Sequence, residues 1–268
     1  MIEAARLRGE EFDGWRIEAC PWPESPKLPR GRWATDEEVA PLRWSLTKDE
    51  VRRLRALSRE SAGVLCGALK RVRRGWSEHE VAGAIAGPLR ARGIFPHVLL
   101  VGADGRVDRY RHPIPTRARV RRKVMVALCA QKGGLITCLT RIVHFGRLPR
   151  ELRRRHDAVC AVDAALHAAT RPGRRWCDLL ETAIRVYRET GYADEWKLHH
   201  QGGPMGYEPR DFKATPSETR LVVESQAVGW NPSITGTKSE DTMLSTGEVL
   251  TGTRDWPMNG SRPDILVL

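Results

Sequence analysis

The chain has 268 residues, of which 41% are hydrophobic and 29% charged, and its net charge is +12. This composition excludes wholesale disorder and a fibrous protein. No apolar run approaches the roughly 20 residues that span a bilayer, so we expect neither a membrane protein nor a membrane partner. The N-terminus lacks the apolar stretch of a secretory signal, and the six cysteines form no C-x-x-C pair. Both features favour a cytoplasmic protein with free thiols.

The positive charge comes mostly from arginine and occurs in short clusters. No zinc knuckle, RNP motif or basic zipper accompanies them, and richness in Arg, Ala, Gly and Pro also follows from a GC-rich genome. We therefore expect a solvated basic surface and do not expect nucleic acid as a partner. The clusters lie within residues 52–55, 70–74, 117–123 and 150–155.

Residues 1–46 are irregular and rich in proline, which interrupts both helices and strands. Exposed tryptophan is costly, so we expect an ordered arm whose aromatic rings are buried against the rest of the chain or a partner subunit. The arm carries four tryptophans, Trp15, Trp22, Trp33 and Trp44.

Two capping boxes mark the first helices. Thr47 with Glu50 begins a long helix with apolar residues at helical spacing up to residue 72. Ser77 with Glu80 begins a second helix, which Gly93 ends.

The central part of the chain predicts strands and then helices. Residues 97–103 read as a strand, and two β-rich runs, 123–131 and 135–145, flank a Lys-Gly-Gly turn typical of a hairpin. Helices are expected over about 149–170 and 176–190. Short strands follow at 226–230, 240–244 and 248–251.

The order of helix, helix and strands occurs twice, at an offset of about 98 residues. At this offset Gly75 meets Gly173 and Gly93 meets Gly191. The repeat predicts an α+β fold built from two duplicated halves that face each other across a central cleft, where ligands usually bind.

Several motifs in this order resemble the creatinase/methionine-aminopeptidase family. They are RHPIPT (111–116), ALCAQKGGLITCLTRIVHFG (127–146), RPG (171–173), HHQGGPMGY (199–207), GWNPSITGTKSEDTML (229–244) and EVLT (248–251). The resemblance covers roughly residues 43–257 and implies the pita-bread fold. It divides the chain into an arm (1–46), a pita-bread domain (47–257) and a C-terminal tail (258–268), without the separate N-terminal domain of creatinase.

Peptidases of that family bind two divalent metals through two Asp, one His and two Glu. Carried over position by position, these ligands fall on Ala127, Cys138, Gly203, Asn231 and Glu240. Only the last is kept, and Ala and Gly have no donor atom. The resemblance therefore implies no metal and no other cofactor here, as in creatinase, which is metal-free.

Three residues are candidates for catalysis. His112 matches a conserved family histidine that serves as the acid/base in creatinase, and imidazole moves protons near neutral pH. Glu240 would orient or accept protons. Cys138 is a candidate nucleophile with His112 as its base, although a small buried residue that fills a vacated metal position is the simpler interpretation.

Further residues are candidates for substrate binding. Arg141 and Arg210 are suited to a carboxylate, while a buried ion pair with Glu240 or Asp241 is an equal alternative for such an arginine. Strand alternation turns only one histidine of the 199–200 pair inward, with a slight preference for His199. The complete set is Arg141, His199, His200, Tyr207, Arg210, Trp230, Asn231 and Lys238.

Two functions fit these residues. The first is a metal-independent, creatinase-like enzyme that acts on a C–N bond of a small anionic amino-acid derivative. The second is an inactive pita-bread domain that serves as a binding or scaffold module. The polar runs HHQGG and KSEDT favour the enzyme, the lost ligands favour the binding module, and we expect a homodimer in either case.

Overall fold

The computed structural model describes residues 35–268, of which residues 39–268 form one compact unit. The predictions for Trp15, Trp22 and Trp33 lie outside the described residues. Trp44 is half-buried and packs edge-on against Phe212, with ring centroids 5.2 Å apart. The compact unit begins before the predicted boundary at residue 47 because the buried Leu46 belongs to its core.

The first half begins with two short helical turns, α2 (Asp36–Val39) and η1 (Ala40–Arg43). The long helices follow, and both predicted capping boxes are confirmed: Thr47 caps the first and Ser77 the second, with both reciprocal hydrogen bonds present in each. The elements of this half are α3 (Lys48–Leu69), α4 (Glu78–Arg90), β1 (Phe95–Ala103), α5 (Gly105–Arg109), β2 (Lys123–Lys132) and β3 (Leu135–His144).

The second half repeats a helix pair followed by three antiparallel strands. It consists of α6 (Arg150–Ala169), α7 (Trp176–Glu189), η2 (Glu195–Leu198), β4 (Gly202–Met205), β5 (Ala227–Trp230), β6 (Ser233–Ile234), β7 (Thr237–Lys238) and β8 (Asp241–Leu244). The run at 248–251 was predicted as a strand, but it makes only an isolated bridge from Val249 to Met243, because the chain turns back through hydrogen bonds to residues 242–244.

The predicted duplication is confirmed by the backbone. Helix α4 begins at Glu78 and α7 at Trp176, an offset of 98 residues. Gly75 and Gly173 precede these helices with φ of +90° and +85°, a conformation that glycine adopts without steric penalty. The same turn is therefore built twice from the same residue type.

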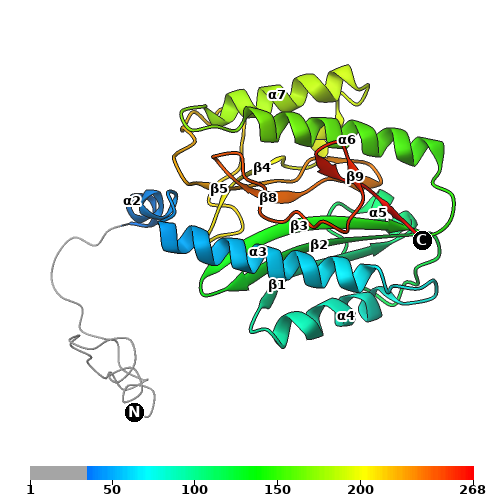
Figure 1. The fold of residues 1–268 in the computed structure, drawn as a ribbon. Helices are drawn as coiled ribbons and strands as arrows, with labels where there is room; N and C mark the ends of the chain where they lie inside the picture. The colour runs from blue at the N-terminus through cyan, green and yellow to red at the C-terminus, as the bar shows by residue number, and fades with distance from the viewer. Residues whose placement is uncertain (1–34) are drawn as a thin grey trace, which may run out of the picture. The chain divides into compact units, whose positions relative to one another are not determined.

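The strands lie between the two helix pairs. In Figure 1, α3 and α4 lie on one side of the strands and α6 and α7 on the other. The sheets have the orders β1-β2-β3-β11 and β4-β5-β8. A bridge between Thr140 of β3 and Glu240, just before β8, joins the two halves. Segments of both halves therefore lie side by side here.

The C-terminal residues form part of the fold, whereas the sequence suggested a tail. Residues 258–268 contain β9 (Met258–Asn259), β10 (Arg262–Pro263) and β11 (Leu266–Val267), and β11 pairs with β3 in parallel. Short paired segments of two residues leave no periodic pattern, so the sequence did not reveal them. Within residues 35–268, no helix combines the length and apolar character needed to cross a membrane.

Candidate functional site

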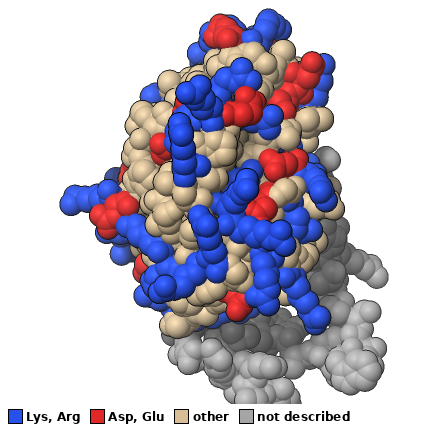
Figure 2. Space-filling view, turned by 90° about the vertical axis from the view of Figure 1, so that its right-hand side faces the viewer, with Lys and Arg blue, Asp and Glu red and all other residues tan. Residues whose placement is uncertain are grey.

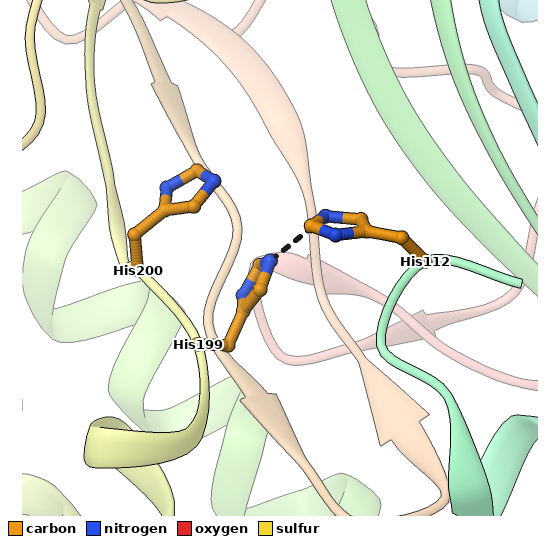
Figure 3. Close-up of side chains that lie close together, drawn as sticks. All are labelled: His112, His199 and His200. Carbon is orange, nitrogen blue, oxygen red and sulfur yellow. Dashed lines mark hydrogen bonds between the residues drawn. The ribbon is translucent and has the colours of Figure 1, made fainter.

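Three histidines from two distant segments form the centre of the candidate site (Figure 3). The Nε2 atoms of His112 and His199 are 3.1 Å apart, within hydrogen-bond distance. The His200 ring lies beside them, with its centroid 4.5 Å from that of His199. Both residues of the 199–200 pair therefore reach this cluster, because the chain after η2 is not a regular strand with alternating faces.

The segment that carries His112 is tied down at both ends. On one side, Arg111 pairs with Glu195 of η2 at 2.5 Å, which draws this segment towards His199. On the other side, the Thr116 hydroxyl donates to the buried Glu78 at 2.6 Å. The RHPIPT motif thus presents its histidine on a loop fixed by two carboxylates from other elements.

All three imidazoles are held in the neutral form. Desolvation and the nearby Lys238 lower the pKa of His112, although Glu240 opposes the shift. Burial, assisted by Lys238, lowers the pKa of His199 far below its usual range. Burial and Arg210 lower the pKa of His200 to about 3. At neutral pH the three rings are therefore uncharged.

A pocket of about 200 Å³ opens beside the histidines and is lined by His199, His200, Gln201 and Lys213, among others. Lys213 is exposed and forms no ion pair with any described carboxylate. Its charge helps to lower the pKa of both His112 and His200. The sequence did not single out Lys213, since a lysine in a loop carries no motif.

Glu240 is buried and is surrounded by hydrogen-bond donors. Its carboxylate lies 2.9 Å from the Lys238 ammonium and 3.3 Å from the Arg210 guanidinium, and it accepts a hydrogen bond from Thr140 at 2.5 Å. Burial alone would raise the pKa of Glu240, but Lys238 and Arg210 outweigh this effect and lower it. Glu240 therefore stays ionised and holds two cations in place.

Cys138 and Cys129 are directly opposite each other on β3 and β2, with Sγ atoms 3.1 Å apart. Cys138 is fully buried, and Arg210 lies 3.6 Å from its sulfur. The hydrogen bond with the Cys129 thiol lowers the pKa of Cys138. The Arg210 guanidinium also lowers this pKa, whereas burial raises it. The structure thus surrounds Cys138 with Cys129 and Arg210, and no hydrogen bond joins it to His112 among the described residues.

The residues at the five family ligand positions do not fit a pair of divalent metals. A Cβ atom at Gly203 would lie 2.1 Å from the carbonyl oxygen of Phe212, so no histidine side chain can extend from this position. Ala127 offers no donor atom. The remaining carboxylate, Glu240, is already paired with the cations of Lys238 and Arg210, and these repel a divalent ion.

The histidine cluster is the group of described residues whose geometry could gather around a single metal ion. One nitrogen of each ring lies within 4.8 Å of the others. The charges of Lys238, Lys213 and Arg210 act on these rings and oppose a cation there. Their field favours an anion instead.

Three residues that the sequence suggested for substrate binding have other surroundings. Trp230 is fully buried, 5.6 Å from the ring of Trp176, and Tyr207 bonds to Glu50 near the tip of the β2–β3 hairpin. The amide oxygen of Asn231 is buried and has no hydrogen-bond partner among the described residues.

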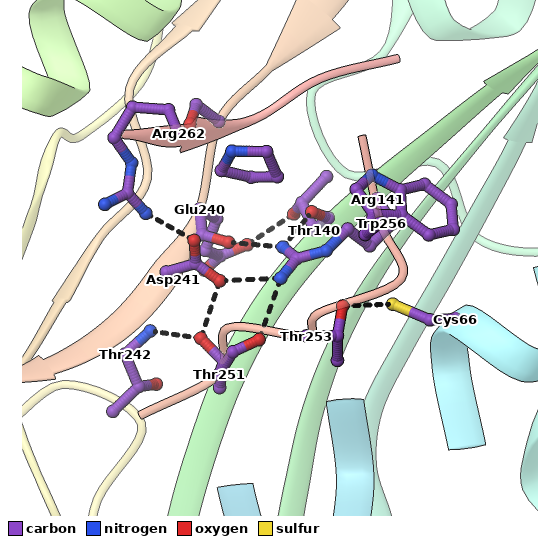
Figure 4. Close-up of polar contacts among 12 residues, drawn as sticks. Cys66, Thr140, Arg141, Glu240, Asp241, Thr242, Thr251, Thr253, Trp256 and Arg262 are labelled. Carbon is purple, nitrogen blue, oxygen red and sulfur yellow. Dashed lines mark hydrogen bonds and ion pairs between the residues drawn. The ribbon is translucent and has the colours of Figure 1, made fainter. Parts of the chain in front are cut away.

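Arg141 belongs to a buried ionic network (Figure 4). Its guanidinium pairs with Asp241 at 2.9 Å and donates to three backbone carbonyls. Asp241 also pairs with Arg262, which in turn contacts Asp163 at 2.9 Å. Burial would raise the pKa of Asp163, but Arg262 outweighs it and the pKa falls to about 2. The buried-pair alternative therefore describes Arg141.

Comparisons with known proteins agree with this architecture. The model of metallopeptidase family M24 matches residues 52–251. The prolidase of Pyrococcus furiosus superposes with a TM-score of 0.73 at 21% identity, covering 82% of this chain and 68% of that one.

Two further structures have similar TM-scores, sequence identities and coverage. A dipeptidase of Pyrococcus horikoshii OT3 has a TM-score of 0.76 at 19% identity, with coverage of 87% and 66%. The Xaa-Pro dipeptidase of Bacillus anthracis has a TM-score of 0.74 at 18% identity, covering 87% of this chain and 67% of that one. The chain thus spans about two thirds of the length of these proteins, and no curated protein sequence matches it. Because the family model covers most of the chain, the protein belongs to metallopeptidase family M24.

Proposed function

We propose that this chain is a metal-independent hydrolase that cleaves a C–N bond in a small anionic amino-acid derivative. The observation that carries the proposal is the pair of neutral imidazoles, His112 and His199, at 3.1 Å beside a pocket with an excess of positive charge. Hydrolysis agrees with the M24 family, whereas the donor set argues against its metals.

In this mechanism His112 acts as the general base. Its neutral ring accepts a proton from water as the water oxygen attacks the carbon of the C–N bond, and the imidazolium returns that proton to the departing nitrogen. His199 supports the tautomer of His112 through the Nε2–Nε2 hydrogen bond. Lys238 and Arg210, fixed by Glu240, supply the positive field for the negative charge that develops on oxygen.

Lys213 is proposed as the group that binds the substrate carboxylate. It lines the same pocket as His199 and His200, its side chain is exposed, and it has no ion-pair partner among the described carboxylates. Arg210, the sequence-based candidate for this role, is engaged by Glu240 and Cys138 deeper in the cleft. A substrate carboxylate at Lys213 leaves its C–N bond beside the histidines.

The experiment screens dipeptides, N-acyl amino acids and N-carbamoyl amino acids with protein dialysed against a strong chelator. We expect turnover that chelation does not change, a metal content far below one equivalent, and a raised KM in Lys213→Met. Lys197→Met, which alters a pocket lysine that is paired with Asp194, is the matched control.

Metal at one equivalent or more, required for turnover, would overturn the proposal. Binding of such ligands without any turnover would favour the alternative, a binding module. A cytoplasmic homodimer remains part of the proposal, and light scattering of the full chain tests the dimer.

A further inference from the structure

Three basic clusters that are far apart in the sequence meet at one end of the molecule. The backbone of Gly75 bonds to Val120 at 2.7 Å, which joins the loop after α3 to the segment before β2. Phe145 bonds to the Arg122 carbonyl at 2.7 Å, and the Arg74 guanidinium lies 5.8 Å from the Phe145 ring. In the sequence these clusters are far apart, and each is typical of a solvated helix or loop. In the fold they lie next to one another and form one surface.

This surface, called the basic end here, has ten exposed cationic side chains. None of them lies within ion-pair distance of a carboxylate in residues 35–268. One of the ten, Arg119, donates to the carbonyl of Gly75, and the side chains of the others make no hydrogen bond to a described residue. The ten are Lys70, Arg71, Arg73, Arg74, Arg117, Arg119, Arg121, Arg122, Arg147 and Arg150.

The nearby acidic groups do not neutralise this charge because they have other partners. Asp104 accepts the backbone N–H groups of residues 121–123. Asp108 pairs with Lys123 at 3.1 Å, and Glu80 closes the capping box of α4. By contrast, the arginines at 153–155, on the following turns of α6, are all paired with carboxylates. The basic end therefore keeps its charge unbalanced.

The basic end is also hollowed. A pocket of about 470 Å³ lies between its segments and is lined by Arg121, Arg122, Lys123 and His144, among others. Figure 2 shows the face on the right of Figure 1, where the C-terminus lies and where Lys and Arg dominate. The histidine cluster contributes no residue to this pocket, so the surface is distinct from the candidate hydrolytic site.

We propose that the basic end binds the phosphate backbone of a nucleic acid. Guanidinium groups match phosphate oxygens in bidentate geometry, and nine of the ten cations are arginine. A row of unpaired cations gains affinity by releasing the counterions of a polyanion. A lipid surface is the weaker fit, because the exposed apolar residues at this end, Val267 and Leu268, are held in or beside strand β11, which pairs with β3.

The test measures fluorescence anisotropy of labelled DNA and RNA duplexes of about 20 base pairs over a range of salt concentrations. The variant Arg73→Gln/Arg121→Gln/Arg122→Gln removes three charges from the basic end. The control Lys48→Gln/Arg59→Gln/Arg174→Gln removes three exposed charges that lie elsewhere and also have no described ion-pair partner. Circular dichroism melting verifies that both triple variants are folded.

We expect the wild type to bind, with log Kd rising linearly with log salt. The first variant should lose affinity at least tenfold and flatten the salt slope by about 2–3, since each phosphate contact contributes about 0.9. The control should change Kd less than about twofold. Equal loss in both variants, or no binding by the wild type, overturns the proposal. Binding only to phosphatidylserine vesicles overturns it in favour of a lipid surface.

Discussion

Glu240 and Asp241 are adjacent carboxylates, equally buried, and they belong to two different polar clusters. Glu240 pairs with Lys238 and Arg210, which makes a set of two basic side chains and one carboxylate. Asp241 faces the interior, where Arg141 and Arg262 are matched by Asp241 and Asp163. The interior cluster is neutral as a set, whereas the Glu240 cluster has one positive charge in excess.

This difference separates a structural network from a site that can bind a ligand. In a buried network with equal numbers of positive and negative groups, every charge has a partner within the network. Such a network specifies how the segments around it pack. An unbalanced cluster beside a pocket attracts an anion from solution. Burial does not distinguish the two carboxylates, but their partners do.

The largest effect on turnover should come from His112→Ala. Loss of a general base typically reduces turnover about 10²–10⁴-fold, and the exposed His112 contributes little to the core. We expect kcat to fall by this factor while the melting temperature stays unchanged. His79→Ala, at an exposed histidine of α4, is the control. Normal turnover in His112→Ala would remove this residue from the mechanism.

A substitution in the interior cluster should lower the free energy of unfolding. Arg262→Met leaves Asp163 and Asp241 as buried carboxylates without this partner, and breaking such a pair costs about 3–5 kcal/mol. Urea unfolding measures the loss, and the exposed Arg188→Met should change it by less than about 0.5 kcal/mol. A loss below about 1 kcal/mol would show that the network does not stabilise the fold.

Glu240→Gln should have an intermediate effect on stability. The amide keeps the shape but loses the charge between Lys238 and Arg210, which should lower the free energy of unfolding by about 1–3 kcal/mol. Turnover should also fall, because both cations lose the group that fixes them. If this variant unfolds as easily as Arg262→Met and its turnover is unchanged, both clusters are structural and the comparison fails.

The smallest effect concerns pH. The pKa of His200 is lowered to about 3, so the folded protein takes up this proton only far below pH 6.5, whereas the unfolded chain binds it near pH 6.5. The unfolded state therefore holds more protons between these values, and stability falls as pH drops through this window. Between about pH 7 and pH 5, the melting temperature of the His200→Gln variant should fall less than that of the wild type. An unchanged pH slope would contradict the lowered pKa.

Much of the fold could be predicted because its signals are local. The capping boxes at Thr47 and Ser77, the hairpin turn and the repeated glycines each depend on neighbouring residues, and all are confirmed. In the observed register, Cys129 of β2 lies opposite Cys138 of β3, so these two side chains share one face of the hairpin. The two-residue strands at the C-terminus were missed because they carry no periodic pattern.

By itself, the sequence determined the helices, the hairpin and the duplication, since each depends on residue type and short-range spacing. Only the tertiary structure decided which charges meet. It placed Arg141 against Asp241 and Arg210 against Glu240, and it joined three basic loops into one surface. The physical reason is that an ion pair or a charged patch depends on contacts between segments about 20–100 residues apart, which no local pattern encodes.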